Sequence, residues 1–156
     1  MNRSEHSRES EYSACVFVVD DNDDLRQMLC VALEAAGFDV VQARTRLELL
    51  GRLAEARPDA LVIDLQRSEA DGLAMLSRVR ARQALRNVPI LFLSGSDDDA
   101  FRWRAMSAGA DWVGVRPLRM LELRKQVSHL VRHGRPVPHN IHPKRRPAVI
   151  QLKRTG

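Results

Sequence analysis

Six residues of the chain stand at the end of short apolar runs or directly after them, and they carry the chemistry of the sequence. The runs are rich in Val, Ile and Leu, which is typical of buried strands. In a parallel sheet the carboxyl ends of the strands meet at one edge, so we expect these residues to converge there. They supply three carboxylates, a hydroxyl, a glycine and a guanidinium: Asp20, Asp21, Asp64, Ser94, Gly95 and Arg116.

Three carboxylates at one sheet edge favour a hard divalent cation. Such oxygen ligands suit Mg²⁺ or Mn²⁺, and crowded carboxylates are costly without a neutralising charge. A phosphoryl group could bind beside the metal and Arg116, and Asp64, on a central strand, is the natural nucleophile toward phosphorus. Ser94 could donate a hydrogen bond to the transferred group, while Gly95 leaves an approach open for the donor. A single aspartate more often forms a cap or turn, so the prediction depends on the combination.

The loop after the first apolar run, DDNDD at residues 20–24, excludes one class of site. A loop that cradles phosphates needs glycines and backbone donors, whereas this loop is negatively charged. The sequence therefore disfavours nucleotide and flavin binding. Cys15 and Cys30 lie within apolar stretches without metal-ligand spacing, so we expect reduced core residues and no disulfide.

Apolar runs alternate with amphipathic stretches along the chain. Strict alternation predicts an α/β fold, in which a parallel sheet is covered by helices on both faces. Gly37 follows the first helical pattern as a C-cap, and Ser96 precedes the fourth as an N-cap. The expected strands lie at residues 15–19, 38–43, 60–63, 89–93 and 112–115, and the expected helices at residues 25–36, 45–56, 72–83, 97–109 and 118–131.

The length of 156 residues, with 44% hydrophobic content, predicts one compact domain. The net charge of +5 arises from seven Lys and Arg after residue 131, because the chain before them is slightly acidic. We expect a polar N-terminal segment at 1–13, a domain at 14–131 and a basic, proline-containing, flexible tail at 132–156. No stretch has the length of a membrane span or the pattern of a secretory signal, so we expect a cytoplasmic protein without a membrane partner.

Four segments of the chain resemble the response-regulator receiver domain of two-component systems. VFVVDDN resembles its first strand with an acidic pair, and LVIDLQRSEADGL its phospho-acceptor strand and loop. PILFLSGS resembles its hydroxyl-bearing fourth strand, and AGADWVGVRPL its fifth strand with a Lys-Pro pair. The resemblance covers about residues 14–131. It implies a flavodoxin-like (βα)5 doubly wound parallel sheet with strand order 2-1-3-4-5.

The same resemblance implies a signalling role without catalytic turnover. Asp64 would accept a phosphoryl group from a sensor histidine kinase or a phosphotransfer protein, giving an aspartyl phosphate. Asp21 and Asp64 would ligate Mg²⁺ directly, Asp20 through water, and Gln66 through its backbone carbonyl. The domain would signal by binding a downstream protein on the face formed by the fourth helix, the fifth strand and the fifth helix.

Three positions depart from the pattern of the receiver family. Arg116 stands where the family has lysine, and a planar guanidinium differs in geometry from a compact ammonium group. Arg-Ser at residues 67–68 replaces the usual Met-Pro, which removes a restraint from the acceptor loop, although Asp-Gly at 71–72 still resembles the expected turn. Val113 occupies a switch position that usually holds an aromatic side chain, so the familiar aromatic read-out is missing.

Three alternative functions stay open at this point. The chain could be a pseudo-receiver, an interaction module that binds its partner without phosphorylation. It could bind nucleic acid through the basic tail, in which Lys, Arg and Arg stand at residues 144–146. A metal-dependent phosphatase would also use an aspartyl nucleophile, but its usual second aspartate is replaced here by Gln66.

Overall fold

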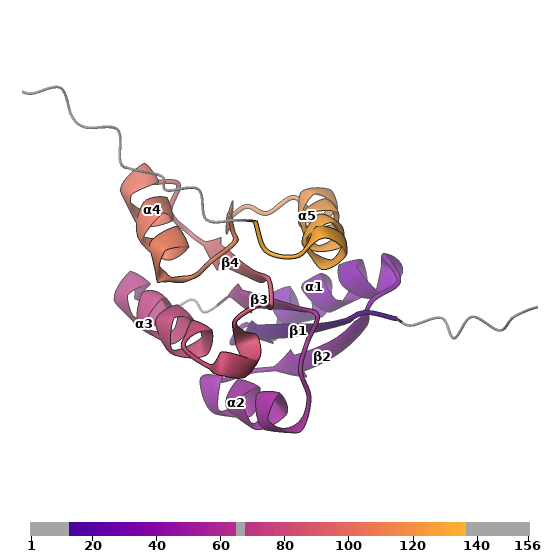
Figure 1. Ribbon diagram of the computed structural model, residues 1–156. Coiled ribbons are helices and arrows are strands. Elements are labelled where there is room, and N and C mark those ends of the chain that lie inside the picture. The colour runs from indigo at the N-terminus through magenta and orange to yellow at the C-terminus, as the bar shows by residue number, and fades with distance from the viewer. Residues whose placement is uncertain (1–12, 65–67, 137–156) are drawn as a thin grey trace, which may run out of the picture.

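The computed structural model of the protein describes residues 13–64 and 68–136 (Figure 1). All strand pairs in its five-stranded sheet are parallel, and the strand order is β2-β1-β3-β4-β5, which confirms the expected flavodoxin-like topology. The strands are β1 (Cys15–Asp20), β2 (Asp39–Ala43), β3 (Ala60–Asp64), β4 (Ile90–Ser94) and β5 (Trp112–Val115). The helices are α1 (Asp23–Ala35), α2 (Arg46–Glu55), α3 (Glu69–Arg80), α4 (Asp99–Ala108) and α5 (Met120–His133), with a short 3-10 turn at Gln83–Leu85.

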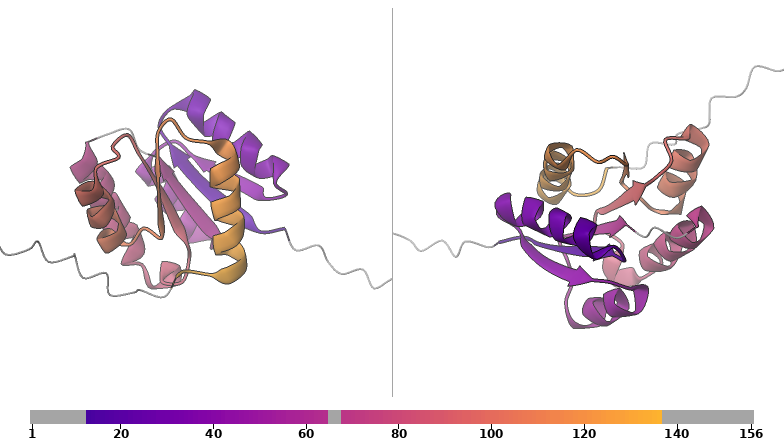
Figure 2. Two further views of the ribbon diagram at one scale, coloured as in Figure 1. Left: turned by 90° about the horizontal axis from the view of Figure 1, so that it is seen from above. Right: turned by 180° about the vertical axis from the view of Figure 1, so that it is seen from behind.

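Helices cover both faces of the sheet, with α1 and α5 on one face and α2, α3 and α4 on the other (Figure 2). Alternate residues of β1 serve the two faces. Val16 and Val18 pack with α1 and α5, whereas Phe17 and Val19 pack with the other three helices. Because both faces of the central strands are buried, the strands are apolar throughout, and the polar residues that end them stand out in the sequence.

The helix starts explain where prediction and structure differ. Helix α4 begins at Asp99 with Asp98 as its N-cap, so the predicted cap at Ser96 is wrong; the Ser96 hydroxyl instead accepts the backbone N–H of Asp98 at 3.2 Å. Helix α3 begins at Glu69, because the Ser68 hydroxyl caps it by accepting the N–H of Asp71 at 3.3 Å. Residues 71–72 therefore lie inside a helix, and the turn expected there is absent.

A glycine with a positive φ angle follows the first helix and the last helix, as is common at helix C-termini. Gly37 follows α1 with φ +93°, a left-handed conformation that glycine adopts at little cost. Helix α5 extends to His133 and Gly134 follows it with φ +77°. Within the described residues, no helix is long and apolar enough to cross a membrane. Of the tail predicted at 132–156, residues 132–133 belong to α5 and Arg135 donates to Asp111, while residues 137–156 lie outside the described residues.

Candidate functional site

The carboxylates of Asp20 and Asp64 form the centre of the candidate site. Asp20 ends β1 and Asp64 ends β3, and the two residues are partners in the register of these neighbouring strands. Their exposed fractions are 0% and 2%. The backbone N–H of Asn22 donates to Oδ1 of Asp20 at 2.9 Å, while Oδ2 of Asp20 is buried without a hydrogen-bond partner among the described residues. Two carboxylates thus lie side by side at the carboxyl edge of the sheet.

Arg116 brings a positive charge directly to Asp64. Its Nη1 donates to Oδ1 of Asp64 at 2.7 Å, across 52 residues of sequence. The backbone supports this reach, because the N–H of Arg116 donates to the carbonyl of Ser94 at 2.8 Å and so continues the pairing of β5 with β4. The Arg116–Pro117 peptide bond is cis. Arg116, which we expect from the resemblance to stand in place of a lysine, therefore contacts the expected phospho-acceptor.

Ser94 and Gly95 complete the edge of the site at the end of β4. The Ser94 side chain is buried, and its hydroxyl oxygen accepts the backbone N–H of Ser96 at 3.0 Å. A Cβ atom at Gly95 would lie 3.3 Å from Nη2 of Arg116. The guanidinium of Arg116 thus lies beside the space that glycine leaves here, and the open approach for a phosphoryl donor stays a prediction.

The electrostatics of the acid pair favour a bound cation. Burial raises the pKa of Asp20 to about 7; the charges of Asp64 and Asp21 add to this, against the hydrogen bond from Asn22 and the charge of Arg116. Burial likewise raises the pKa of Asp64, although the charge of Arg116 acts in the opposite direction. One guanidinium therefore does not fully compensate the two buried carboxylates.

The other expected site residues lie in different surroundings. Asp21 is exposed at the start of the loop after β1, and Val113, the expected switch residue, is buried in β5. Gln66, the expected carbonyl ligand, lies outside the described residues. Among the residues that the structure describes, no three His, Cys, Asp or Glu side chains form a ready-made metal cluster. Hard oxygen donors are present, however, and the unpartnered Oδ2 of Asp20 is a suitable ligand for Mg²⁺.

Arg26 is a positioning residue that the sequence analysis missed. Its side chain is only 7% exposed, and its Nη1 donates to the backbone carbonyl of Asp20 at 2.9 Å. Its Nη2 donates to Asp23 at 2.6 Å, and its Nε to the side chain of Gln42 at 3.1 Å. Arg26 thereby fixes the acidic loop to α1 and β2. A lone arginine on the apolar face of α1 is the signal that could have revealed it.

The fold and this edge site together define a class of signalling domain, the receiver. The family model described as "Response regulator receiver domain" matches residues 16–128. The chain belongs to this family, and the resemblance drawn from the four sequence segments is confirmed.

Two curated relatives carry the same domain in longer chains. The phosphate regulon transcriptional regulatory protein PhoB of Rhizobium meliloti is 31% identical over 121 residues, which is 78% of this chain and 53% of PhoB. The transcriptional regulatory protein PrrA of Mycobacterium tuberculosis is 35% identical over 117 residues, which is 75% of this chain and 49% of PrrA. The chain spans about half the length of the curated relatives it matches.

Solved structures of similar chains agree with the fold. The chemotaxis response regulator CheY4 of Vibrio cholerae is 27% identical with a TM-score of 0.67, and the match covers 74% of this chain and 98% of CheY4. A putative response regulator of Chloroflexus aurantiacus is 29% identical with a TM-score of 0.70, covering 77% of this chain and 98% of the other. Both likenesses extend over nearly the whole of the compared chain.

Proposed function

We propose that this receiver accepts a phosphoryl group on Asp64 from a histidine kinase or phosphotransfer protein and signals through protein–protein binding in the cytoplasm, without turning over a substrate. The observation that carries the proposal is the place of Asp64. Its carboxylate lies at the carboxyl end of a central strand, beside the buried Asp20 and in direct contact with the guanidinium of Arg116. A nucleophile, a second acid and a cation are thus adjacent.

The proposed transfer uses groups that the chain already supplies. A carboxylate oxygen of Asp64 forms a bond to phosphorus while the P–N bond of a phosphohistidine breaks, and the leaving imidazole takes a proton. Arg116 offsets the charge of the phosphoryl oxygens. The Ser94 hydroxyl already accepts from Ser96, so its own proton is available for a phosphoryl oxygen.

Asp20, Asp21, Asp64 and the carbonyl of Gln66 are the proposed ligands of Mg²⁺, or of Mn²⁺. The bound cation would supply positive charge to the transferred phosphoryl group. The buried, unpartnered Oδ2 of Asp20 and the raised pKa of Asp20 support this assignment, because both indicate that hydrogen bonds and nearby positive charge do not fully balance the negative charge of this carboxylate.

Arg116 has two tasks that compete. In the described state it holds Oδ1 of Asp64, whereas phosphorylation requires that a carboxylate oxygen be open to the donor. Because the hydrogen bond from Arg116 reaches Oδ1, either the donor approaches Oδ2 of Asp64 or the ion pair opens during transfer; in both cases the guanidinium would contact the phosphoryl group. Bidentate binding of phosphate suits arginine better than lysine, so the altered residue is compatible with the proposed chemistry.

The output surface that we propose is the face of α4, β5 and α5, where a downstream protein would bind. Trp103 on α4 has an exposed fraction of 47%, and a large amphipathic ring at the surface is typical of a binding site. Trp112 of β5 is instead partly buried and packs against the core cluster on the α1 and α5 side, and its ring fills the space next to Gly114.

The test is intact mass after incubation with Mg²⁺ and acetyl phosphate. We expect the parent chain to gain one phosphoryl group and Asp64→Asn to gain none, while Asp97→Asn, an exposed aspartate in the loop before α4, is labelled like the parent. Labelling of Asp64→Asn, or the absence of any adduct in the parent under conditions that modify another receiver, would contradict the proposal.

A pseudo-receiver is the second candidate, because the contact of 2.7 Å between Arg116 and Asp64 could hold the acceptor closed. Arg116→Lys separates the two candidates. If the parent is not labelled and Arg116→Lys is, the arginine silences an otherwise complete site. The chain would then act by binding its partner without phosphorylation.

A further inference from the structure

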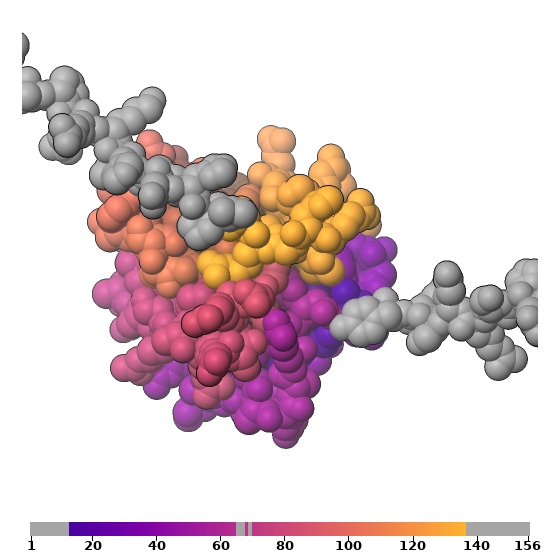
Figure 3. Space-filling model, in the orientation of Figure 1, coloured from indigo at the N-terminus to yellow at the C-terminus, as the bar shows by residue number. Residues whose placement is uncertain are grey.

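A groove of about 470 Å³ lies between the C-terminal part of α1 and the outer face of α5. The two helices pack side by side on one face of the sheet (Figure 2). In the space-filling view, α5 is yellow-orange and α1 is indigo to purple (Figure 3). The carboxylates of the candidate site do not line this groove, so it is a separate feature of the molecule.

One wall of the groove is basic. Leu121, Lys125, Ser128 and Arg132 follow one another at intervals of three and four residues, which places them on one face of α5. Arg124, His129 and His133 line the groove beside them, whereas Glu122, the acidic residue of α5, does not. The basic wall thus offers three permanent positive charges and two histidines to whatever lies against it.

The other wall is apolar. Ala35 of α1 and its C-cap residue Ala36 line the groove, and Val31 and Met28 lie one and two turns before Ala35 on the same helix face. Val31 is 63% exposed and Met28 53% exposed, and Leu121 at the start of the basic wall is 61% exposed. Leu121 lines the groove itself, whereas Met28 and Val31 continue the same face of α1 beyond its lining residues.

We infer that this groove binds an acidic amphipathic helix of a partner protein. An apolar stripe on such a helix fits against α1, and its carboxylates pair with Arg124, Lys125 and Arg132 on α5. Residues 121–132 of α5 extend over roughly 16 Å, which matches about three turns of helix. The proposal does not depend on phosphorylation of Asp64.

Charge and polarity favour this occupant over two others. In a two-fold dimer the same patch meets itself, so a second copy of the chain would place the basic wall against either another basic wall or the apolar wall, and neither supplies carboxylates. A nucleic acid would pair with the basic wall but leave the exposed Met28 and Val31 without an apolar counterpart. Only the acidic amphipathic helix satisfies both walls.

The test uses a labelled synthetic helix of about 16 residues with leucine on one face and glutamate on the other. A scrambled peptide of the same composition serves as the first control. Binding is followed by fluorescence anisotropy, and the site by amide chemical shifts of the full chain. We expect the helix to bind, the scrambled peptide to bind at least tenfold more weakly, and shifts to change at residues 28–36 and 121–133.

Two variants examine the walls separately. Arg124→Glu/Lys125→Glu should weaken binding at least tenfold, and Met28→Gln/Val31→Gln should weaken it without a change of charge. Arg46→Glu/Arg52→Glu makes the same charge change on exposed positions of α2, and we expect less than a twofold effect. Thermal unfolding checks that each variant folds.

Three results would overturn the inference. The first is no binding of the helix at about 1 mM, which corresponds to less than about 4 kcal/mol of binding free energy. The second is an equal loss of binding affinity in the α2 control variant. The third is a set of amide shift changes that lies away from the groove. Tighter binding of a short DNA duplex than of the helix, at the same residues and lost at higher salt, would identify a phosphate-binding surface and also reject the acidic helix.

Discussion

The ion pair between Arg116 and Asp64 sets the charge balance of the site at the scale of single residues. Replacing Arg116 by glutamine removes a positive charge that lies 2.7 Å from Oδ1 of Asp64. The carboxylates should then attract a divalent cation more strongly, because the guanidinium no longer repels the cation or pairs with Asp64, and charges interact strongly at short range in a partly buried site. We expect Arg116→Gln to bind Mg²⁺ about tenfold more tightly than the parent, which corresponds to about 1.4 kcal/mol.

Isothermal titration calorimetry with Mg²⁺ measures this change. Arg119→Gln is the matched control, since Arg119 is exposed three residues away and its loss alters the net charge equally. Equal affinities in the parent and both variants would show that Arg116 does not compete with the metal for Asp64.

Arg26 gives a second prediction at the residue scale. The variant Arg26→Met keeps the length of the side chain but removes the donor to the buried carbonyl of Asp20 and the bonds to Asp23 and Gln42. An unsatisfied buried carbonyl costs about 1–3 kcal/mol, so we expect a loss of about 2 kcal/mol in the free energy of unfolding. Urea denaturation measures it.

Arg44→Met provides the comparison for Arg26→Met. Arg44 also approaches Asp23, at 3.7 Å, but both side chains are mostly exposed, and exposed pairs contribute little. A similar loss in the two variants would mean that the buried carbonyl contact is unimportant and that Arg26 acts only as a surface charge.

The sequence predicts the acidic residues of the site better than the basic residue that orients them. Asp20, Asp64 and Ser94 end apolar strands, so their position follows from chain order alone. The contact of Arg26 depends on the folded structure, because a donor on the buried face of α1 reaches the carbonyl of Asp20 only when the helix packs beside β1. Hydrogen bonds of this kind depend on tertiary packing, which residue spacing does not reveal.

At the scale of elements, Gly72 couples α3 to the strand that carries Ser94. A Cβ atom at Gly72 would lie 2.9 Å from Cζ of Phe92 in β4. Gly72→Ala must therefore displace the ring of Phe92, which also packs near Phe101 of α4 at 6.1 Å between centroids. We expect a loss of about 1–3 kcal/mol in the free energy of unfolding, typical of an overpacked core.

A double-mutant cycle shows whether the Phe92 ring causes the loss. Phe92→Leu in the Gly72→Ala background should recover part of the stability, because the smaller side chain makes room for the new methyl group. Gly51→Ala in α2 meets nothing within 4 Å and should instead stabilise the protein by roughly 0.5–1 kcal/mol. Additive effects of Gly72→Ala and Phe92→Leu would contradict the proposed contact.

The first residue of each helix is the feature of the elements that the sequence predicts least well. Periodicity identifies the five helices, but their first residues depend on which of several polar side chains caps them. Ser96 and Asp98 are both good caps, and the structure uses Asp98, whose side chain accepts the N–H of Ala100 at 3.1 Å. Ser68 starts α3 earlier than the apolar pattern indicates, so Gly72 becomes a packing residue.

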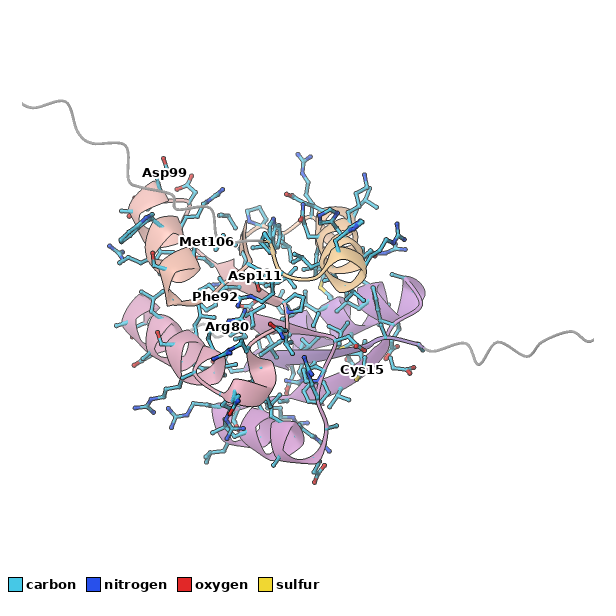
Figure 4. The ribbon with its side chains drawn as sticks, viewed as in Figure 1. Cys15, Arg80, Phe92, Asp99, Met106 and Asp111 are labelled. Atoms are coloured by element: carbon cyan, nitrogen blue, oxygen red, sulfur yellow. The ribbon has the colours of Figure 1, made fainter. Side chains whose placement is uncertain are left out.

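Across the whole molecule, a buried charge cluster joins the sheet edge opposite the candidate site to the segment after α5. Asp111 precedes β5, and its side chain is 3% exposed. Its Oδ2 accepts from Nη2 of Arg80 at 2.8 Å and from the backbone N–H of Ile90 at 2.9 Å, and its Oδ1 accepts from Nε of Arg135 at 2.9 Å. Arg80 and Asp111 lie close together in Figure 4. One carboxylate thereby connects α3, β4, β5 and the chain beyond α5.

Asp111→Asn tests this connection by removing one partner of a buried ion pair while keeping its shape. Such a change leaves the guanidinium of Arg80 without its carboxylate partner, although the carbonyls of Leu85, Val88 and Gly109 still accept from it, so we expect a loss of about 3 kcal/mol in the free energy of unfolding. Arg135→Gln should cost less, about 1 kcal/mol, because Arg80 and Ile90 still bind Asp111. Urea denaturation measures both losses.

Binding of Mg²⁺ provides the independent control for the two variants. The four residues of β5 separate Asp111 from Arg116 by about 16 Å, so neither variant should change the affinity for Mg²⁺ more than twofold. If Asp111→Asn left the free energy of unfolding unchanged, the cluster would add little to stability, as is found for some buried ion pairs. A loss of Mg²⁺ affinity without unfolding would instead show that the two ends of β5 are coupled, and the charge cluster would then belong to the switch rather than to the scaffold.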